Sequence, residues 1–385
     1  MKGVNKMRAV TFQGKEKMQV TTVPDPIIEE PTDAIIKVTS TAICGSDLHL
    51  YHNGNLVLND DYVVGHEPMG IVEEVGPDVK HLKVGDRVVV SFNVSCGHCE
   101  FCKNDMESQC DESNKNPEVD YGGLFGFGKL NGDYSGGQAE FMRVAHADHS
   151  VFKVPDNELP DEKVLFLSDI VPTAWWSVEH AGVKPGDTVI VLGSGPVGLF
   201  AQRFAKMKGA KRVIAVDSVK HRLEYSAKNI GIETLNFEEV DIPGMALLDM
   251  THGGADVVID CVGMDGKERK IEKVTNLISP QKGTTRPIEM ASAAVKKFGT
   301  IMLTGVYLTP ATTFPINHIF ARNVTLKTGQ ASVPHLMPKL YEKIRNNDFD
   351  PTDIITHTMP LEEAAKGYDI FDKKEDNNIK VVLKP

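Results

Sequence analysis

The sequence has 385 residues, of which 41% are hydrophobic and 25% charged, and its formal net charge is −11. A chain of this length exceeds what one hydrophobic core usually supports, so we expect two domains and exclude a small disulfide-stabilised scaffold. The negative charge and the lack of a Lys/Arg block argue against nucleic acid or an anionic membrane surface as the main partner. The start, MKGVNKMRAV, lacks the apolar core of a signal peptide, and no stretch is apolar over the length of a membrane span. A reducing cytoplasm is therefore the predicted location.

Residues up to 150 contain short apolar runs separated by Gly, Pro and Asp, among them AIIKVTS, YVVGHEPMGIVEEV and DRVVVSF. Such runs indicate an irregular β-rich domain. Two motifs in this part hold potential metal ligands: AICGSDLH contains Cys44, and VVGHEPMG contains His66 and Glu67. Taken singly, Cys44 and His66 are also explained as core side chains, since free cysteine is among the most buried residue types.

Four of the six cysteines follow the spacing C-x2-C-x2-C-x7-C, namely Cys96, Cys99, Cys102 and Cys110. A disulfide is disfavoured in a reducing compartment. A ferredoxin-type iron–sulfur motif would close with C-x3-C-P, whereas Asp111 follows the last cysteine here. Four close thiolates repel one another unless a cation holds them, and a closed four-thiolate set suits tetrahedral zinc. We predict a structural zinc site, with the iron–sulfur cluster as the alternative.

From Asp187 the pattern becomes strand, glycine turn and helix: TVIVLGSGPVGLFAQRFAKMKGA, then KRVIAVD, ADVVIDCVG, GTIMLTGV and NVTLKTG. Continuous apolar strands that alternate with helices indicate a parallel sheet covered on both faces. The tail, LEEAAKGYDIFDKK followed by IKVVLKP, predicts a helix and a last strand.

The first of these turns predicts a dinucleotide site. Gly193, Gly195 and Gly198 form G-x-G-x-x-G between a strand and a helix, and Asp217 closes the next strand. The glycines would let the backbone approach a pyrophosphate at the helix N-terminus. Asp217 would bind the ribose hydroxyls and repel a 2′-phosphate, which favours NAD over NADP. The alternative is a turn that serves helix packing alone.

The segment 264–298 contains KERKIEKVTNLISPQKGTTRPIEMASAAVKKF and is longer than one crossover helix needs. We interpret it as a flap over the cofactor that would slow the exchange of NAD.

The pattern G-H-E-x2-G-x5-G-x2-V, which runs from Gly65 to Val79, resembles the signature of the zinc-dependent alcohol dehydrogenases of the medium-chain dehydrogenase/reductase family. The motifs FN-V-x-C-G, SGGQAE and LSDI-x-PT most resemble the glutathione-independent formaldehyde dehydrogenase branch. The resemblance covers nearly the whole chain. It implies an α/β fold with a β-rich GroES-like catalytic domain at 1–158 and 318–385, whose structural zinc lobe is 93–113. A Rossmann domain with a doubly wound parallel sheet would occupy 159–317 and bind NAD.

The resemblance also implies a catalytic zinc held by Cys44, His66 and a residue of FLSDIVPT. Many relatives have cysteine at the third position, where this chain has Asp169, so we expect a Cys–His–Asp site. A carboxylate donates less charge than a thiolate, so the zinc should be a stronger Lewis acid and more easily lost. Asp47 is expected to orient His66, and Glu67 to assist ligand exchange at the metal.

Hydride would pass between an alcohol and NAD, and the proton would leave through Ser46, His49 and the cofactor ribose. A turn hydroxyl and a surface imidazole are the alternatives for the two relay residues.

Other residues are assigned to the substrate pocket and the cofactor. Phe92 is expected to line the substrate pocket, with a core aromatic as the alternative. Some relatives have a phosphate-binding arginine at the position of Gly45, so we assign pyrophosphate neutralisation to the helix dipole and Lys380. The other cofactor residues that we assign are Thr173, Pro196, Val197, Arg222 and Val262.

We therefore predict a dehydrogenase that uses NAD, one catalytic and one structural zinc ion, and a small primary alcohol or aldehyde such as hydrated formaldehyde. Relatives that retain their nucleotide can run dismutation, and the sequence leaves that choice open. As in the family, a homodimer or homotetramer is expected. The alternatives are a polyol or amino-alcohol (threonine-type) dehydrogenase and, from another class, a non-catalytic NAD-sensing protein that keeps only the structural zinc. A zinc-free reductase of the same fold is disfavoured by Cys44 and His66.

Overall fold

The computed structural model describes residues 5–54, 58–114, 116, 119–156, 158–266, 283–307, 311 and 313–385. Its chain forms two compact units, Met1–Pro172 with Ser332–Pro385, and Thr173–Ala331. Both boundaries lie later than the predicted ones, at 158/159 and 317/318. Residues 161–168 pack on strands of the first unit, and the strand at Thr325–Thr328 joins the sheet of the second.

The first unit is built on a seven-stranded sheet in the order β16-β17-β3-β4-β5-β9, with β8 paired to β3. These strands are β3 (Ala34–Ile43), β4 (Met69–Val75), β5 (Arg87–Val90), β8 (Phe141–Val144), β9 (Val151–Lys153), β16 (Ile355–Pro360) and β17 (Lys380–Lys384). All neighbours are antiparallel except the parallel pair β16 and β17. Two small sheets accompany it, β1 (Lys6–Phe12) with β2 (Met18–Pro24) and β6 (Asn93–Val94) with β7 (Gly123–Leu124).

The C-terminal strand β17 lies in this sheet between β16 and β3. Its register pairs Val381 with Ile43, which sets the neighbouring Lys380 next to Cys44. Residues more than three hundred positions apart in sequence therefore meet at one sheet position. The predicted last strand is confirmed, and it carries Lys380 into the interior of the unit.

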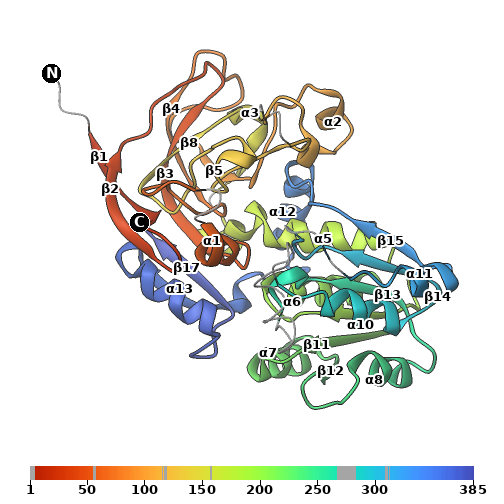
Figure 1. The fold of residues 1–385 in the computed structure, drawn as a ribbon. Coiled ribbons are helices and arrows are strands. Elements are labelled where there is room, and N and C mark those ends of the chain that lie inside the picture. The colour runs from red at the N-terminus through yellow and green to blue at the C-terminus, as the bar shows by residue number, and fades with distance from the viewer. Residues whose placement is uncertain are drawn as a thin grey trace. The chain divides into compact units, whose positions relative to one another are not determined.

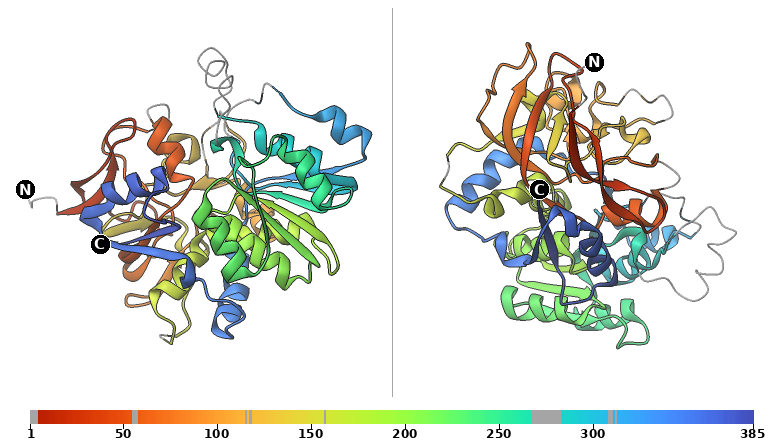
Figure 2. Two further views of the ribbon diagram at one scale, coloured as in Figure 1. Left: turned by 90° about the horizontal axis from the view of Figure 1, so that it is seen from below. Right: turned by 90° about the vertical axis from the view of Figure 1, so that its left-hand side faces the viewer.

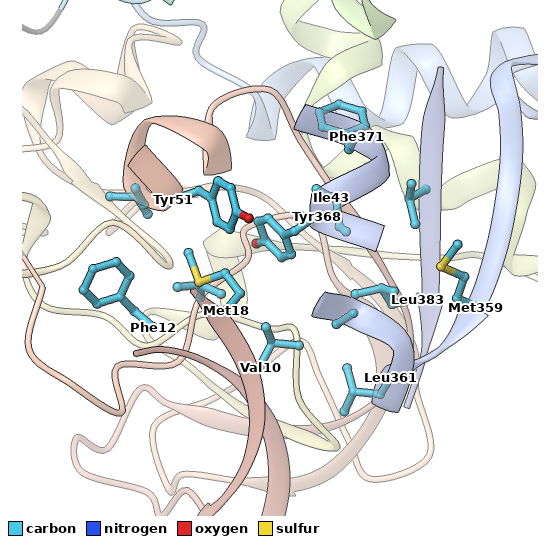
Figure 3. Close-up of a cluster of buried hydrophobic side chains, with 14 of the residues drawn as sticks. Val10, Phe12, Met18, Ile43, Tyr51, Met359, Leu361, Tyr368, Phe371 and Leu383 are labelled. Atoms are coloured by element: carbon cyan, nitrogen blue, oxygen red, sulfur yellow. The ribbon is translucent and has the colours of Figure 1, made fainter. Parts of the chain in front are cut away.

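Helices complete the first unit: α1 (Asp47–Asn53), α2 (Glu100–Lys103), α3 (Ala147–Ser150), α4 (Asp161–Val164), α12 (Met337–Arg345) and α13 (Ala364–Lys373). Helix α13 buries Ala364, Gly367, Tyr368 and Phe371, the i, i+3, i+4, i+7 spacing of an amphipathic helix. Figure 3 shows this face packed in a core that also includes side chains from β1, β2 and α1. The C-terminal segment is therefore part of the core of this unit.

The second unit is a six-stranded parallel sheet in the order β12-β11-β10-β13-β14-β15. Its strands are β10 (Thr188–Leu192), β11 (Arg212–Asp217), β12 (Glu233–Asn236), β13 (Ala255–Asp260), β14 (Val295–Leu303) and β15 (Thr325–Thr328). The helices are α6 (Pro196–Met207), α7 (Lys220–Tyr225), α8 (Pro243–Met250), α10 (Arg286–Ala294) and α11 (Ile316–Ala321), while α5 (Ile170–Ala181) spans the unit boundary. Figures 1 and 2 show helices on both faces of this sheet. The predicted doubly wound α/β class is confirmed.

The segment 264–298, predicted as a flap, is described only in part. Residues 267–282 lie outside the described residues, and Arg286–Ala294 form α10, which packs on β13 and β14. No helix among the described residues is both long enough and apolar enough to span a membrane.

An ion pair fixes the short helix α4 to the central sheet. The Asp161 carboxylate accepts hydrogen bonds from Arg87 Nη2 at 2.7 Å and Nε at 3.0 Å, and a further one from the Thr39 hydroxyl. Burial raises the pKa of Asp161, but these hydrogen bonds outweigh it and hold the pKa below its ordinary value. The pair therefore stabilises the folded chain when Asp161 is ionised.

We expect Asp161→Asn to lower the free energy of unfolding by about 1–3 kcal/mol at pH 7. The native pKa of Asp161 is depressed, so the wild-type advantage is present above about pH 4 and disappears as the pH falls through that native pKa. Urea unfolding of both proteins between pH 7 and pH 3 measures the difference.

The control is Glu342→Gln, which breaks an exposed pair with Arg345 and should cost less than about 0.5 kcal/mol. A difference between Asp161→Asn and wild type that stays constant down to pH 3 would contradict the assigned pKa shift.

Candidate active site

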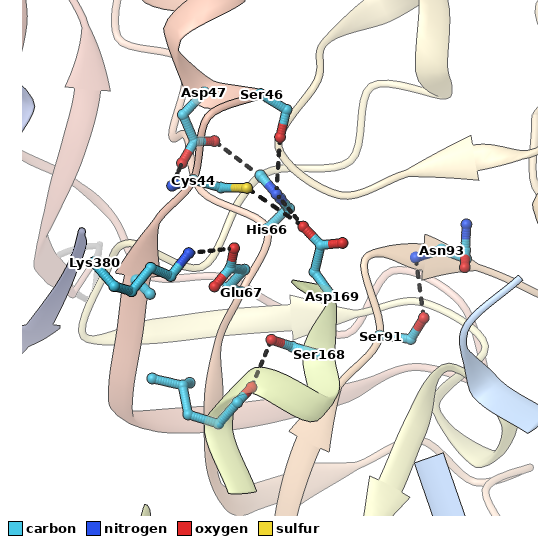
Figure 4. Close-up of polar contacts among 12 residues, drawn as sticks. Cys44, Ser46, Asp47, His66, Glu67, Ser91, Asn93, Ser168, Asp169 and Lys380 are labelled. Atoms are coloured by element: carbon cyan, nitrogen blue, oxygen red, sulfur yellow. Dashed lines mark hydrogen bonds and ion pairs between the residues drawn. The ribbon is translucent and has the colours of Figure 1, made fainter. Parts of the chain in front are cut away.

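The predicted catalytic ligands come from three places in the first unit. Cys44 follows the end of β3, His66 and Glu67 precede β4, and Asp169 lies between the turn η4 (Leu165–Ser168) and α5. All four side chains are buried, and their ligand atoms lie within 4.8 Å of one another. Figure 4 shows Cys44, His66 and Asp169 pointing toward a common centre. The structure thus brings together Cys44, His66 and Asp169, the three side chains that the family resemblance assigned to one metal site.

The distances in this cluster are those of converging ligands. Asp169 Oδ2 lies 3.1 Å from His66 Nε2 and 3.5 Å from Cys44 Sγ. Burial raises the pKa of the Cys44 thiol to about 11, and Glu67 adds to the rise. Burial lowers the pKa of His66, but Asp47 and Asp169 outweigh it and raise that pKa well above its ordinary value. A thiol and an imidazole that hold their protons this firmly between carboxylates suit a cation in place of those protons.

Asp47 fixes the orientation of His66. Its Oδ1 lies 2.9 Å from His66 Nδ1, and its Oδ2 accepts the backbone N–H of Cys44 at 3.0 Å. The carboxylate is fully buried at the start of α1. It therefore holds the imidazole with Nε2 toward Cys44 and Asp169, as a ligand histidine requires. Zinc, which takes sulfur, nitrogen and carboxylate ligands, fits this donor set.

Glu67 and Lys380 form a buried ion pair beside these ligands. Lys380 Nζ donates to Glu67 Oε1 at 2.7 Å, and both side chains are 0% exposed. Glu67 Oε2 is buried without a hydrogen-bond partner. The sequence assigned Lys380 to the cofactor pyrophosphate, whereas the structure places its ammonium in the interior against Glu67. The strand register that sets Lys380 beside Cys44 is the reason.

The predicted relay residues lie at the N-terminus of α1. Ser46 Oγ is 3.2 Å from His66 Nε2, which places this hydroxyl at the ligand cluster. His49 is half-buried on the first turn of the helix.

Two aromatic rings lie beside His66. Phe92 meets the His66 ring edge-on with centroids 6.2 Å apart. Phe127, which the sequence did not single out, lies closer, at 4.9 Å.

Two sequence motifs interlock behind His66. Gly65 has φ +95°, and a Cβ built on it would lie 2.3 Å from Cγ of Gln138. Gly136 and Gly137 similarly leave no room beyond the backbone of Val64 and the ring of Pro68. The glycines of VVGHEP and SGGQ are therefore required by the close approach of these two segments, which positions His66.

The four lobe cysteines also converge in the structure. Their sulfur atoms lie within 4.8 Å of one another, with Cys96 and Cys102 as well as Cys99 and Cys110 separated by 3.9 Å. A tetrahedron of zinc–sulfur bonds of about 2.3 Å has sulfur separations of about 3.8 Å. A disulfide would need about 2.05 Å, and all four cysteines are free. The geometry fits the predicted tetrahedral metal site.

The glycine turn of the second unit has the predicted strand-to-helix form. Gly193 has φ +92°, and a Cβ there would lie 2.7 Å from Val262 Cγ2. A Cβ on Gly198 would lie 2.1 Å from the carbonyl oxygen of Gly193, so the helix packs directly on the turn. Pro196 is the first residue of α6 and Val197 is half-buried beside it.

Asp217 sits at the end of β11, as predicted, and is hydrogen-bonded to the turn. Its Oδ2 accepts the backbone N–H of Ser194 at 2.6 Å, and its Oδ1 accepts those of Ser218 and Val219. Arg222 is buried, and its Nη1 would lie 3.6 Å from a Cβ on Gly195. Thr173 lies on α5, where its carbonyl accepts the Ser177 hydroxyl.

Comparison with known proteins agrees with both units. Residues 30–156 match the family described as alcohol dehydrogenase GroES-like domain, and residues 196–284 match that described as zinc-binding dehydrogenase. The uncharacterized zinc-type alcohol dehydrogenase-like protein AdhB of Bacillus subtilis strain 168 is 54% identical over 380 residues, which cover 98% of this chain and 100% of that protein.

Two further relatives have nearly equal sequence identity to the chain. The solved structure of alcohol dehydrogenase TADH from Thermus sp. ATN1 has a TM-score of 0.84 and 33% identity, covering 98% of this chain and 99% of the other. The glutathione-independent formaldehyde dehydrogenase of Pseudomonas aeruginosa strain PAO1 is 32% identical over 389 residues, 95% of this chain and 94% of that protein. The chain is thus no more similar to the formaldehyde dehydrogenase than to the Thermus alcohol dehydrogenase.

The interlock of Gly65 with Gln138 generates a direct test. Gly65→Ala adds a Cβ that meets Gln138 at a positive φ, so we expect it to lower the free energy of unfolding by more than about 3 kcal/mol. Gly85→Ala is the matched control, because φ there is +90° but nothing lies within 4 Å of its Cβ. It should cost only the backbone strain, about 1–2 kcal/mol. Equal losses in the two variants, measured by denaturant unfolding, would contradict the packing constraint.

Proposed function

The chain belongs to the zinc-dependent alcohol dehydrogenases of the medium-chain dehydrogenase/reductase family, and we propose that it transfers hydride between a small primary alcohol or aldehyde and NAD. The observation that carries the proposal is the buried convergence of Cys44, His66 and Asp169, with His66 oriented by Asp47. We propose that these three residues hold a catalytic zinc and that the four lobe cysteines hold a structural one.

Zinc supplies a Lewis acid that lowers the pKa of an alcohol, and NAD accepts the hydride. The chain's own residues would bind and orient these groups and move the proton. Ser46 would accept the proton of the substrate hydroxyl, because its Oγ lies at the ligand nitrogen of His66. His49, three residues further along α1, would pass the proton on.

We assign Glu67 a role in ligand exchange at the metal. One of its carboxylate oxygens is held by Lys380 and the other has no partner, while the side chain lies within the ligand cluster. Lys380 would keep this carboxylate from binding the metal permanently, because the ion pair competes for the same charge. The aromatic rings of Phe92 and Phe127 beside His66 would give the substrate an apolar wall.

NAD is proposed as the cofactor on the basis of Asp217. A carboxylate at the end of the second strand favours ribose hydroxyls over a 2′-phosphate. The glycine turn, Pro196, Val197, Arg222 and Val262 would surround the nucleotide, together with Thr173. Formaldehyde in its hydrated form is included among the proposed substrates because of the motifs shared with the formaldehyde dehydrogenase branch. A homodimer or homotetramer stays a prediction.

Metal content and turnover test the catalytic site together. We expect two zinc ions per wild-type chain and one in Asp169→Ala or Cys44→Ser, with kcat/KM for short alcohols or formaldehyde reduced by more than about 100-fold. Cys261→Ser, which removes a half-buried thiol of the second unit, is the control and should keep both ions. Zinc is measured by mass spectrometry and turnover by NADH absorbance.

A single zinc in an inactive wild type would favour the NAD-sensing alternative instead. Two zinc ions and full activity in Asp169→Ala would show that this carboxylate is not a ligand.

The nucleotide preference is tested at Asp217. Asp217→Asn keeps an acceptor oxygen for the Ser194 amide but removes the negative charge. We expect the ratio of kcat/KM for NAD to that for NADP to fall by about 10–100-fold, as for the loss of one charged hydrogen bond and its repulsion of the 2′-phosphate. Steady-state kinetics with both nucleotides measure the ratio. An unchanged ratio would mean that Asp217 serves only to fix the turn.

A further inference from the structure

A hydrogen-bonded chain leads from the C-terminal helix to the ligand histidine. We propose that Gln138 and Tyr368 are positioning residues of the catalytic metal site, which act on His66 through Asp47. The inference rests on the proposed function only in that Cys44, His66 and Asp169 bind a metal. Neither residue touches the ligand cluster itself, and neither stood out in the sequence as a site residue.

The contacts form one continuous path. The Tyr368 hydroxyl donates to Gln138 Oε1 at 3.0 Å. Gln138 Nε2 donates to the Ala42 carbonyl at 3.1 Å and to Asp47 Oδ2 at 3.3 Å. Asp47 Oδ1 then meets His66 Nδ1 at 2.9 Å. Every side chain on this path is no more than 1% exposed, so water does not compete for these hydrogen bonds.

The neighbours of Gln138 fix the orientation of its amide. Burial raises the pKa of Tyr368 well above its ordinary value, so its hydroxyl remains a proton donor. The Ala42 carbonyl on the other side is only an acceptor. A flipped amide would set its oxygen against that carbonyl and against the Asp47 carboxylate, leaving buried groups unpaired. The N–H group of Gln138 is therefore held toward Asp47.

Because the Gln138 amide is fixed, the two carboxylate oxygens of Asp47 have different hydrogen-bond partners. Oδ2 accepts two N–H groups, from the Cys44 backbone and from Gln138. Oδ1 is then left for His66 Nδ1, which keeps Nε2 aimed at the metal ligands. Outer partners of a ligand histidine orient its ring and tune its basicity. Gln138 thereby holds Asp47, which orients His66, and Tyr368 in turn holds Gln138.

Packing holds the outer end of the path. Tyr368 stacks on Tyr51 with ring centroids 5.7 Å apart and planes 24° from parallel (Figure 3). Tyr51 belongs to α1, whose first residue is Asp47. Helix α13 is thus tied to Asp47 twice, once through the Gln138 amide and once through the body of α1.

The test compares Tyr368→Phe, Gln138→Met and a matched control. Tyr341→Phe is the control, because that hydroxyl also belongs to a tyrosine that is almost fully buried in the first unit, but it donates to Asp156. Zinc affinity at the catalytic site is measured by chelator competition, and the coordination by the visible spectrum of the cobalt-substituted protein.

We expect Gln138→Met to weaken catalytic zinc binding by about 10–100-fold and Tyr368→Phe by about 3–10-fold, both with a changed cobalt spectrum. Adding Tyr368→Phe to Gln138→Met should weaken binding less than about 2-fold further, because the two residues act in series. Tyr341→Phe should leave affinity and spectrum at the wild-type values.

Wild-type affinity and spectrum in Tyr368→Phe and Gln138→Met, with stability reduced as in Tyr341→Phe, would overturn the inference and leave the metal site standing. A wild-type chain that binds zinc at the lobe cysteines only would overturn the metal site itself, so the two failures are distinguishable.

Discussion

Ionisable groups that are almost completely withdrawn from water around His66 impose a charge balance on the first unit. Three carboxylates, those of Asp47, Glu67 and Asp169, lie in or beside this cluster with at most 7% of the residue exposed. The buried ammonium of Lys380 compensates one of them. The other two contact the His66 imidazole. Buried negative charge is costly, so the proposed divalent cation at Cys44, His66 and Asp169 would add positive charge where these carboxylates converge.

The charge balance depends on the complete topology of the first unit. The ligands follow β3, precede β4 and follow η4, while Lys380 arrives on β17 as the partner strand of β3. The ion pair of Glu67 with Lys380 requires the C-terminal strand, because Lys380 is the first residue of β17. We expect the proposed metal binding to be coupled to the folding of this unit, because Cys44, His66 and Asp169 are far apart in sequence and converge only in the folded chain. The lobe cysteines differ from this cluster, because the four cysteines lie close together in sequence.

Local motifs explain why so much of this arrangement was predictable. Strand, glycine turn and helix repeat in order along the second unit, and the cysteine spacing describes a metal site without reference to any other part of the chain. The Cys44 and His66 assignments came from a family signature, and the structure brings both side chains together. Asp169 required the same resemblance, since an aspartate beside a hydrophobic helix has no metal-binding pattern of its own.

Contacts between residues far apart in the chain could not be predicted from the sequence. The ion pair of Lys380 with Glu67 follows from a strand register, and the sequence suggested a phosphate contact for this lysine instead. The approach of Gln138 to Gly65 and Asp47 likewise depends on how two loops pack. Zinc-edge anomalous diffraction from crystals of the zinc-loaded wild type tests the central claim most directly. It should show two zinc positions per chain, one at the lobe cysteines and one bonded to Cys44 Sγ, His66 Nε2 and an oxygen of Asp169, with bonds of about 2.0–2.3 Å. A second peak away from these three atoms, or none at all, would contradict it.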